Sequence, residues 1–246
     1  MISAGVRRTF AVAGRVLTQI RNDKRTLALL LLVPSLLIGL LSWMLDSQTA
    51  FDRVGPSLVG LFPFTVMFLL TSVTTLRERR SGTLERFLTM PLRKGEFVVG
   101  YALAFGALAV LQALITLRFA VYVCGLTITA EAWLLIVVAI SNALMGMSLG
   151  LLASAFANTE FQVVQLMPTF IFPQIMLGGI FVPRDKLPDV LHSISDWLPL
   201  SHAIQALNDL TNSSSSKDIV TEIWVLVAWV LVAVTLGSMT LRRRTP

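Results

Sequence analysis

The sequence predicts an all-α protein embedded in a membrane, and three observations support this prediction. Hydrophobic residues make up 55% of the 246-residue chain and charged residues only 14%, whereas soluble domains carry about 25% charged residues. The apolar residues gather into six long runs without a charged side chain. The lysines and arginines cluster between alternate runs. These features argue against a soluble globular domain and against a disordered chain.

Each apolar run is long enough to cross a bilayer as a helix, which takes about 20 residues. We end the third run at Leu117, because an arginine such as Arg118 costs about 2.5–3.5 kcal/mol at mid-membrane. Pro168 and Pro173 predict that the fifth helix is bent and faces the protein interior, where irregular backbone is tolerated. The expected spans are residues 27–45, 56–76, 97–117, 133–156, 161–182 and 223–241.

The distribution of charge predicts the orientation of these spans. Fifteen of the 20 lysines and arginines lie in the N-terminal arm, in the loop after the second span or at the C-terminus. Positive residues stay on the cytoplasmic side of a membrane. We therefore expect a multi-pass protein of the inner (plasma) membrane with both termini in the cytoplasm. This asymmetry explains the isoelectric point of about 10.2 without a nucleic-acid partner.

The N-terminal residues 1–26 show the pattern of an amphipathic helix. Apolar residues recur at steps of three and four, which places them on one helical face: Ile2, Val6, Phe10, Ala13, Leu17 and Ile20. We interpret this segment as a helix that lies in the inner membrane interface. The alternative is a passive, positively charged anchor.

The loop at residues 77–96 contains a second short helical pattern. Ser81-Gly82 and Pro91 delimit it, and Leu84, Phe87 and Leu88 share one face. From the residues alone, this helix either docks onto another protein or lies among lipid headgroups.

Two segments resemble known motifs. The run RERRSGTLERFLTMPLRKGEFVVGYALA is similar to the signature of ABC-2 type exporter permeases, most closely those of the daunorubicin-resistance type. Phe87-Leu88 stands where this family usually has paired leucines, and the other matching residues are Glu78, Gly82, Thr83, Leu84, Glu85 and Pro91. Beyond the fifth run, LGGIFVPRDKLPDVLHSISDWLPLSHAIQAL resembles the outer motif of the same family.

The resemblance implies a coupling helix at residues 77–96 that meets an ATPase subunit, and an outer re-entrant segment at residues 183–222. The coupling role is carried onto Glu78, Gly82, Thr83, Leu84, Glu85, Arg86, Phe87 and Leu88. The resemblance also implies a homodimer, or a heterodimer with a second permease. ATP and magnesium would be bound by the partner ATPase, and no cofactor is expected on this chain.

The sequence contains no G-x-x-x-x-G-K-[ST] phosphate loop, so we expect no ATPase site and no enzyme activity of its own. No span carries an ionisable residue of the kind that proton relays use. Amides at depth provide the candidate pathway residues, namely Asn142, Gln165 and Gln174. Hydrogen bonds between helices are the favoured alternative role for them. His192 and His202 lack the spacing of a metal site, so no metal is expected.

The sequence therefore favours the permease subunit of an ATP-driven exporter of a hydrophobic or amphipathic substrate, such as a drug, a lipid or a polyketide-like compound. Two alternatives remain open at this point. One is a permease for a polysaccharide or a glycolipid. The other is a membrane scaffold or assembly factor without transport activity.

Overall fold

The chain forms a bundle of helices in the computed structural model, which describes residues 4–80, 94–127, 132–211 and 216–239. Every regular element in these four ranges is a helix, which confirms the all-α prediction. Five of the described helices are long and apolar enough to cross a membrane. They are α2 (Lys24–Leu45), α3 (Gln48–Arg80), α5 (Lys94–Tyr122), α6 (Ala132–Ala153) and α10 (Ser216–Met239).

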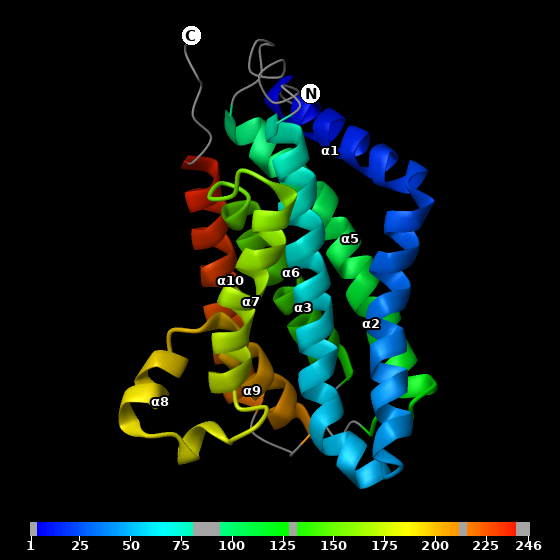
Figure 1. Cartoon of the computed structure of the whole chain (residues 1–246), viewed down its shortest axis with the longest axis vertical. Coiled ribbons are helices and arrows are strands. Elements are labelled where there is room, and N and C mark those ends of the chain that lie inside the picture. Colours follow the sequence, from blue (N-terminus) through cyan, green and yellow to red (C-terminus); the bar gives the residue numbers. More distant parts are fainter. Residues whose placement is uncertain (1–3, 81–93, 128–131, 212–215, 240–246) are drawn as a thin grey trace.

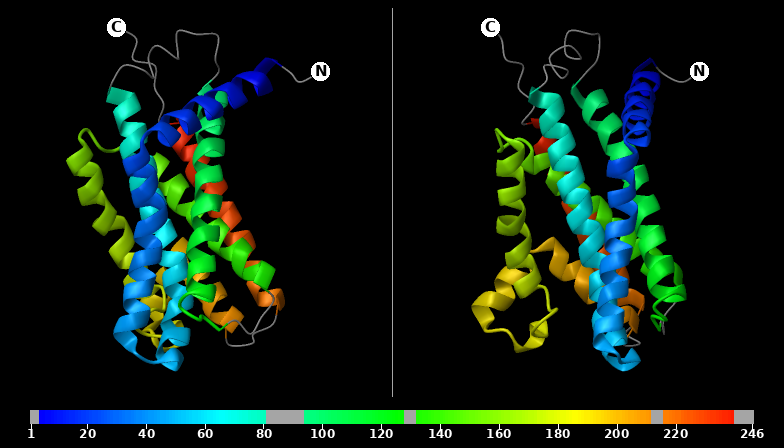
Figure 2. Two further views of the ribbon diagram at one scale, coloured as in Figure 1. Left: turned by 90° about the vertical axis from the view of Figure 1, so that its right-hand side faces the viewer. Right: turned by 45° about the vertical axis from the view of Figure 1, so that its right-hand side comes forward.

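The long helices alternate in direction (Figures 1 and 2). Helices α2, α5 and α7 (Glu160–Leu177) run away from the end of the bundle at which α1 (Ala4–Asn22) lies, and α3, α6 and α10 return toward it. We call this end the α1 end. The opposite end contains α9 (Pro199–Thr211), and we call it the α9 end. The start of α1 and the described end of α10 lie at the same end, as expected for an even number of crossings.

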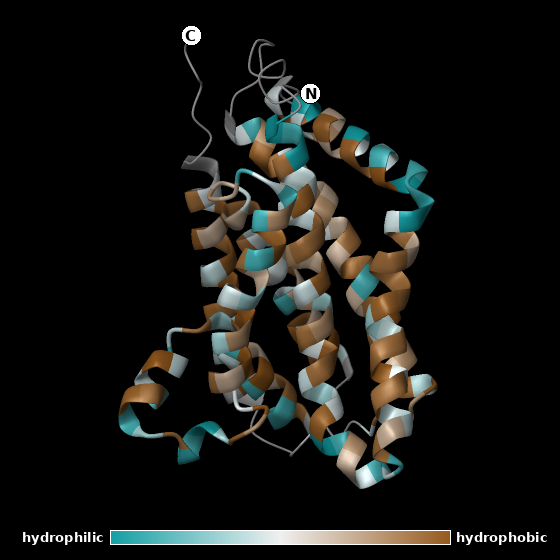
Figure 3. Cartoon of the chain, in the orientation of Figure 1, coloured by the Kyte–Doolittle hydropathy of each residue, from teal (hydrophilic) through white to brown (hydrophobic). Residues whose placement is uncertain are grey.

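Helix α7 (Glu160–Leu177) differs from the expected fifth span. It ends five residues before Val182 and is absent from the five helices that qualify as membrane spans within the described ranges. Hydrophilic bands interrupt the apolar ones along the ribbon of this helix (Figure 3). Only three of its residues are buried, so the expectation that it faces the interior of this chain is wrong. A sixth crossing by this helix therefore stays a prediction.

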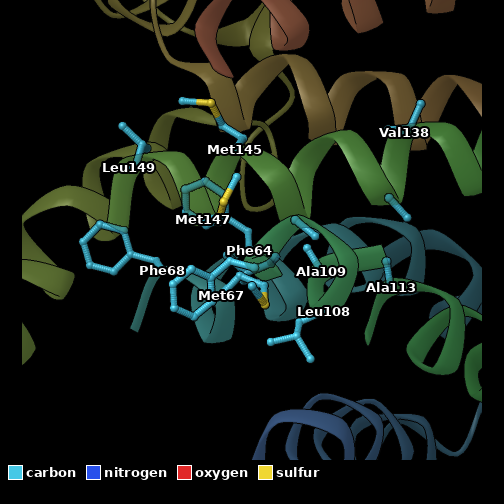
Figure 4. Close-up of a cluster of buried hydrophobic side chains, with 14 of the residues drawn as sticks. Phe64, Met67, Phe68, Leu108, Ala109, Ala113, Val138, Met145, Met147 and Leu149 are labelled. Carbon is cyan, nitrogen blue, oxygen red and sulfur yellow. The ribbon is translucent and has the colours of Figure 1, made fainter. Parts of the chain in front are cut away.

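The centre of the bundle is the contact between α3 and α6. A β-carbon on Gly146 would lie 2.2 Å from the carbonyl oxygen of Phe64, and one on Gly150 would lie 2.5 Å from that of Phe68. Only glycine permits so close an approach of two helix backbones. Around this contact, phenylalanine and methionine side chains of α3 pack against residues of α5 and α6 (Figure 4). The glycine pair therefore determines how closely the central helices pack.

Helix α1 lies obliquely across the α1 end and packs on α5 (Figure 1). Its buried face consists of Thr9, Val12, Ala13, Val16 and Ile20. The expected apolar stripe is only partly buried, because the Phe10 side chain is 62% exposed and that of Val6 is exposed as well. The buried face of α1 differs from the expected stripe because α1 packs closely on α5 through Val12. A β-carbon on Gly100 of α5 would lie 2.8 Å from Val12.

Helices α3 and α5 extend well beyond the apolar runs from which they were predicted. Helix α3 begins at Gln48, directly after a turn in which Asp46 has a φ of 44°, and not at Pro56. Helix α5 continues through Arg118 to Tyr122, so it is longer than the run that we ended at Leu117. Arg118 is exposed near the α9 end of this helix.

The segment between α7 and α10 forms short helices at the α9 end: the 3₁₀ helix η1 (Arg184–Lys186), α8 (Asp189–Ser195) and α9. The apolar face of α9, formed by Ala203, Ile204, Leu207 and Leu210, is completely buried against α3, α6 and α10. In contrast, most apolar side chains around α8 are exposed, including Val190 and Trp197. Helix α9 therefore belongs to the core of the bundle, and α8 lies outside it.

Candidate functional site

The loop between α3 and α5 carries the predicted coupling residues. Seven of them, Gly82, Thr83, Leu84, Glu85, Arg86, Phe87 and Leu88, lie outside the described residues. The eighth, Glu78, lies in the last turn of α3. The site is therefore built from the two helix ends that flank residues 81–93 and from the elements that contact these ends.

Helix α1 forms ion pairs with both flanking helices. Arg15 Nη2 lies 3.3 Å from Glu78 Oε1 at the end of α3, and Arg8 Nη1 lies 4.0 Å from Glu96 Oε2 at the start of α5. The Glu78 side chain is only 7% exposed. A carboxylate buried to this extent needs a charged partner, because losing one partner of a buried ion pair is strongly destabilising. The two contacts connect α1 to both ends of the predicted coupling loop.

Aromatic packing holds the start of α5 in place. The ring centroids of Phe97 and Tyr101 lie 4.3 Å apart, and those of Tyr101 and Phe105 lie 5.9 Å apart. The second spacing lies within the usual range for favourable ring–ring contacts, and the first is slightly shorter. All three rings belong to α5, and its contact with α1 is the close approach of Val12 to Gly100. The first turns of α5 are therefore packed directly against α1.

The end of α3 is also connected to α7. Arg77 donates two hydrogen bonds to Glu160, with Nε to Oε1 at 2.7 Å and Nη2 to Oε2 at 2.9 Å. The hydrogen bond from Arg77 holds the pKa of Glu160 below its usual value. Because this pair is exposed, it contributes about 0–1 kcal/mol to stability. It nevertheless places the first turn of α7 beside the coupling loop.

The three candidate pathway residues lie in different surroundings. Asn142 is fully buried in α6, and its Nδ2 donates to the carbonyl oxygen of Gly60 in α3 at 2.7 Å. Gln174 is buried in α7; its Oε1 accepts from the backbone N–H of Leu200 at 3.2 Å. Gln165 is exposed on α7. The structure therefore does not bring the three together, and two of them form contacts between elements.

A polar network at the α9 end contains residues that the sequence analysis did not assign to a site. His202 of α9 forms a hydrogen-bonded ion pair with Glu222 of α10 through Nδ1, and its Nε2 contacts the carbonyl oxygen of Asp196 at 2.8 Å. Arg184 donates to Gln205 and to Asp196. Burial lowers the pKa of His202, but the hydrogen bonds to Glu222 and Asp196 outweigh it and raise the pKa above its usual value. This network connects η1, α9 and α10.

Sequence reasoning missed these pairs because their members are far apart in the chain. One signal was present at the α1 end: Glu78 is an acidic residue among Arg77, Arg79 and Arg80. An acid in such surroundings is typical of a specific ion pair, but the partner on α1 was not evident from the pattern. In the part of the chain that the structure describes, no group of three or more His, Cys, Asp or Glu side chains is placed to hold a metal ion.

Comparison with known proteins identifies relatives of the chain. The family model described as "ABC-2 type transporter" matches residues 7–210. ABC transporter G family member 20 of Dictyostelium discoideum is 30% identical over 159 residues, which cover 65% of this chain and 22% of that protein. The probable multidrug ABC transporter permease YbhR of Escherichia coli is 26% identical over 175 residues, covering 71% and 48%.

A third relative is the linearmycin resistance permease protein LnrN of Bacillus subtilis. It is 25% identical over 185 residues, which cover 73% of this chain and 48% of that protein. The chain thus spans about half, or less, of the length of these curated relatives.

Proposed function

The chain belongs to the ABC-2 type transporter family, and from this premise we propose that it is the permease subunit of an ATP-driven exporter. Permeases of this family normally work with an ATPase subunit. We propose that the ATPase is a separate chain, which binds ATP and magnesium and contacts residues 78–88. The exported substrate is a hydrophobic or amphipathic molecule.

The observation that carries this proposal is the pairing of α1 with both helices that flank the coupling loop. Arg15 and Arg8 contact Glu78 and Glu96, so a force on the loop acts on three helices together. Helix α3 then extends through the centre of the bundle to the α9 end. A push by an ATPase at residues 81–93 would in this way be passed to α1, α3 and α5 together, and to α6 through its close contact with α3.

The arrangement of α7 supports a second permease copy as a partner. Apolar side chains on this helix are exposed, including Phe161, Phe172 and Met176, and the polar Gln165 is exposed as well. Lipid solvates an exposed amide poorly. A second copy that covers α7 would supply partners for Gln165 and place it between two permeases, where a substrate passes.

The charge distribution supports the location in the membrane. The α1 end contains the arginines of α1 and of the last turn of α3. By the positive-inside rule, we propose that this end faces the cytoplasm and that the protein lies in the inner (plasma) membrane. The α9 end, with the acidic residues Asp185, Asp189 and Asp196, then faces outward.

Reconstitution tests the proposal. The chain is placed in proteoliposomes with its genome-neighbouring ATPase, and export of a fluorescent amphiphile is measured with and without ATP. We expect transport only when both subunits and ATP are present, and an increase of ATP hydrolysis over that of the ATPase alone. Uphill transport by the chain alone, or no response of the ATPase to the chain, would contradict the proposal.

A further inference from the structure

A cleft of about 770 Å³ lies at the α9 end, away from the coupling loop. Its walls are the first turns of α3, the segment that follows α7, and the last turns of α9. Pockets for small molecules usually measure about 300–1,000 Å³. The cleft is therefore large enough for a drug-sized ligand or for the head of a large amphiphile.

The polar side chains of the cleft balance in charge. Arg53 and Arg184 contribute two positive charges, and Asp185 and Asp209 contribute two negative charges. The neutral lining residues Ser57, Gln205 and Asn208 carry groups that donate and accept hydrogen bonds. An anion would meet two aspartates here, and a cation would meet two arginines. The lining thus offers both donors and acceptors without selecting for net charge.

Contacts across the walls organise part of this lining. The Ser57 hydroxyl donates to Asn208 Oδ1 at 3.0 Å, which joins α3 to α9. Arg184 is held by Gln205 and Asp196. Gly179, with a φ of 91°, turns the chain after α7 so that Arg184 returns toward α9. Because these groups are held in place before a ligand arrives, binding loses less conformational entropy.

An apolar surface adjoins the polar lining. Val54, Ile180 and Phe181 also line the cleft, and Phe181 is exposed at its rim. Val182, which follows Phe181 in the chain, and Phe172 and Met176 on α7 are exposed apolar side chains as well. A ligand with a polar head in the cleft can therefore extend an apolar tail along α7.

We propose that this cleft binds the uncharged, polyhydroxylated head of an amphiphile. A hydroxyl group both donates and accepts a hydrogen bond, so a head with several hydroxyls pairs with the alternating arginine, amide and carboxylate groups. A site built for such pairing rejects heads that leave its polar groups unpaired. The inference rests on the proposed function, because it names the class of amphiphile that the exporter takes.

The test measures binding in the absence of an ATPase. The chain is reconstituted in phosphatidylcholine nanodiscs and titrated with radiolabelled decyl maltoside below its critical micelle concentration. Decylphosphocholine, decyltrimethylammonium and decyl sulfate serve as competitors with the same tail, and maltose serves as the head without a tail. We expect saturable binding of one decyl maltoside per chain, with at least tenfold weaker competition by the zwitterionic, the cationic and the anionic amphiphile and by maltose.

Matched variants locate the site. Asp185→Ala and Arg53→Ala remove lining groups and are expected to weaken decyl maltoside binding at least fivefold each. Asp189→Ala and Lys186→Ala change exposed residues that do not line the cleft, and both are expected to bind like the wild type. Equal binding by lining and control variants would overturn the inference, as would tighter binding of the zwitterionic amphiphile, of a charged amphiphile or of free maltose.

The same variants separate this inference from the proposed function. If decyl maltoside binding by the wild type or the variants differs from these expectations while ATP-driven export persists, the inference is wrong and the proposed function stands. If decyl maltoside binds as expected but the reconstituted pair exports nothing, the site stands and the proposed function fails.

Discussion

Helices α6 and α7 follow one another in the chain and both carry amides, yet they occupy opposite places in the bundle. Helix α6 lies at the centre, against α3, α5, α9 and α10, and its Asn142 bonds across to Gly60. Helix α7 lies at the edge, against α3, α8 and α9, and only three of its residues are buried. The presence of an amide therefore does not decide whether a helix is central.

Glycine accounts for much of the difference. Gly146 and Gly150 allow the backbone of α6 to approach that of α3, whereas α7 contains no glycine and is interrupted by Pro168 and Pro173. A helix without small residues on its contact face keeps its neighbours further away. Helix α7 accordingly retains a face that is available to a second chain.

The largest expected effect concerns Gly146. Gly146→Ala places a methyl group 2.2 Å from the Phe64 carbonyl oxygen, and we expect a loss of about 3 kcal/mol in stability, because overpacking forces backbone shifts. Gly14→Ala is the control, since nothing lies within 4 Å of a β-carbon there; it should gain about 0.5–1 kcal/mol. Thermal unfolding of the detergent-solubilised chain measures both. Equal stability of the two variants would show that the close contact between α3 and α6 does not exist.

A smaller effect separates the amides of the two helices. Asn142→Leu removes the hydrogen bond to Gly60, and we expect a loss of about 1 kcal/mol, within the range for polar contacts between membrane helices. Gln165→Leu should leave stability unchanged, because the side chain is exposed, but should reduce export by the reconstituted pair. If Gln165→Leu destabilises the single chain and leaves export unchanged, the contrast between the two helices is wrong.

The pH response of the α9 end is expected to be the smallest effect, below about 1 kcal/mol, as for one hydrogen-bonded pair. The pKa of His202 is raised by Glu222 and Asp196, so its contribution is complete below the pKa of the unfolded chain and is lost as pH rises through the folded value. Hydrogen exchange should therefore show α9 loosening at alkaline pH while α6 stays protected. His202→Gln should abolish this response, and an unchanged response in that variant would assign it to another group.

The sequence was sufficient to predict the helical class, the alternating directions and the family. Long uncharged runs and basic clusters are local properties that each segment carries by itself. The apolar face of α9 is a local property of the same kind, because Ala203, Ile204, Leu207 and Leu210 repeat at helical spacing; all four are buried.

The remaining features depend on residues that are far apart in the chain. The partner of Glu78 is Arg15, 63 residues away, and that of His202 is Glu222 on the next long helix. The peripheral position of α7 depends on how closely the other helices pack with one another at the centre of the bundle. The sequence of α7 alone does not predict that packing. Gln174 illustrates the same point: it was a candidate for the pathway, and its Oε1 contacts the start of α9.

The most direct test asks whether movement of the ATPase is passed to the permease through residues 78–88. The variant Leu84→Asp, Glu85→Arg, Arg86→Glu is reconstituted with the ATPase, and the number of substrate molecules exported per ATP hydrolysed is compared with that of the wild type. A double variant at the opposite end, Lys186→Glu with Asp189→Lys, is the control. We expect ATP hydrolysis without export for the triple variant, with membrane insertion intact and the control unaffected. Wild-type export per ATP by the triple variant would contradict the account.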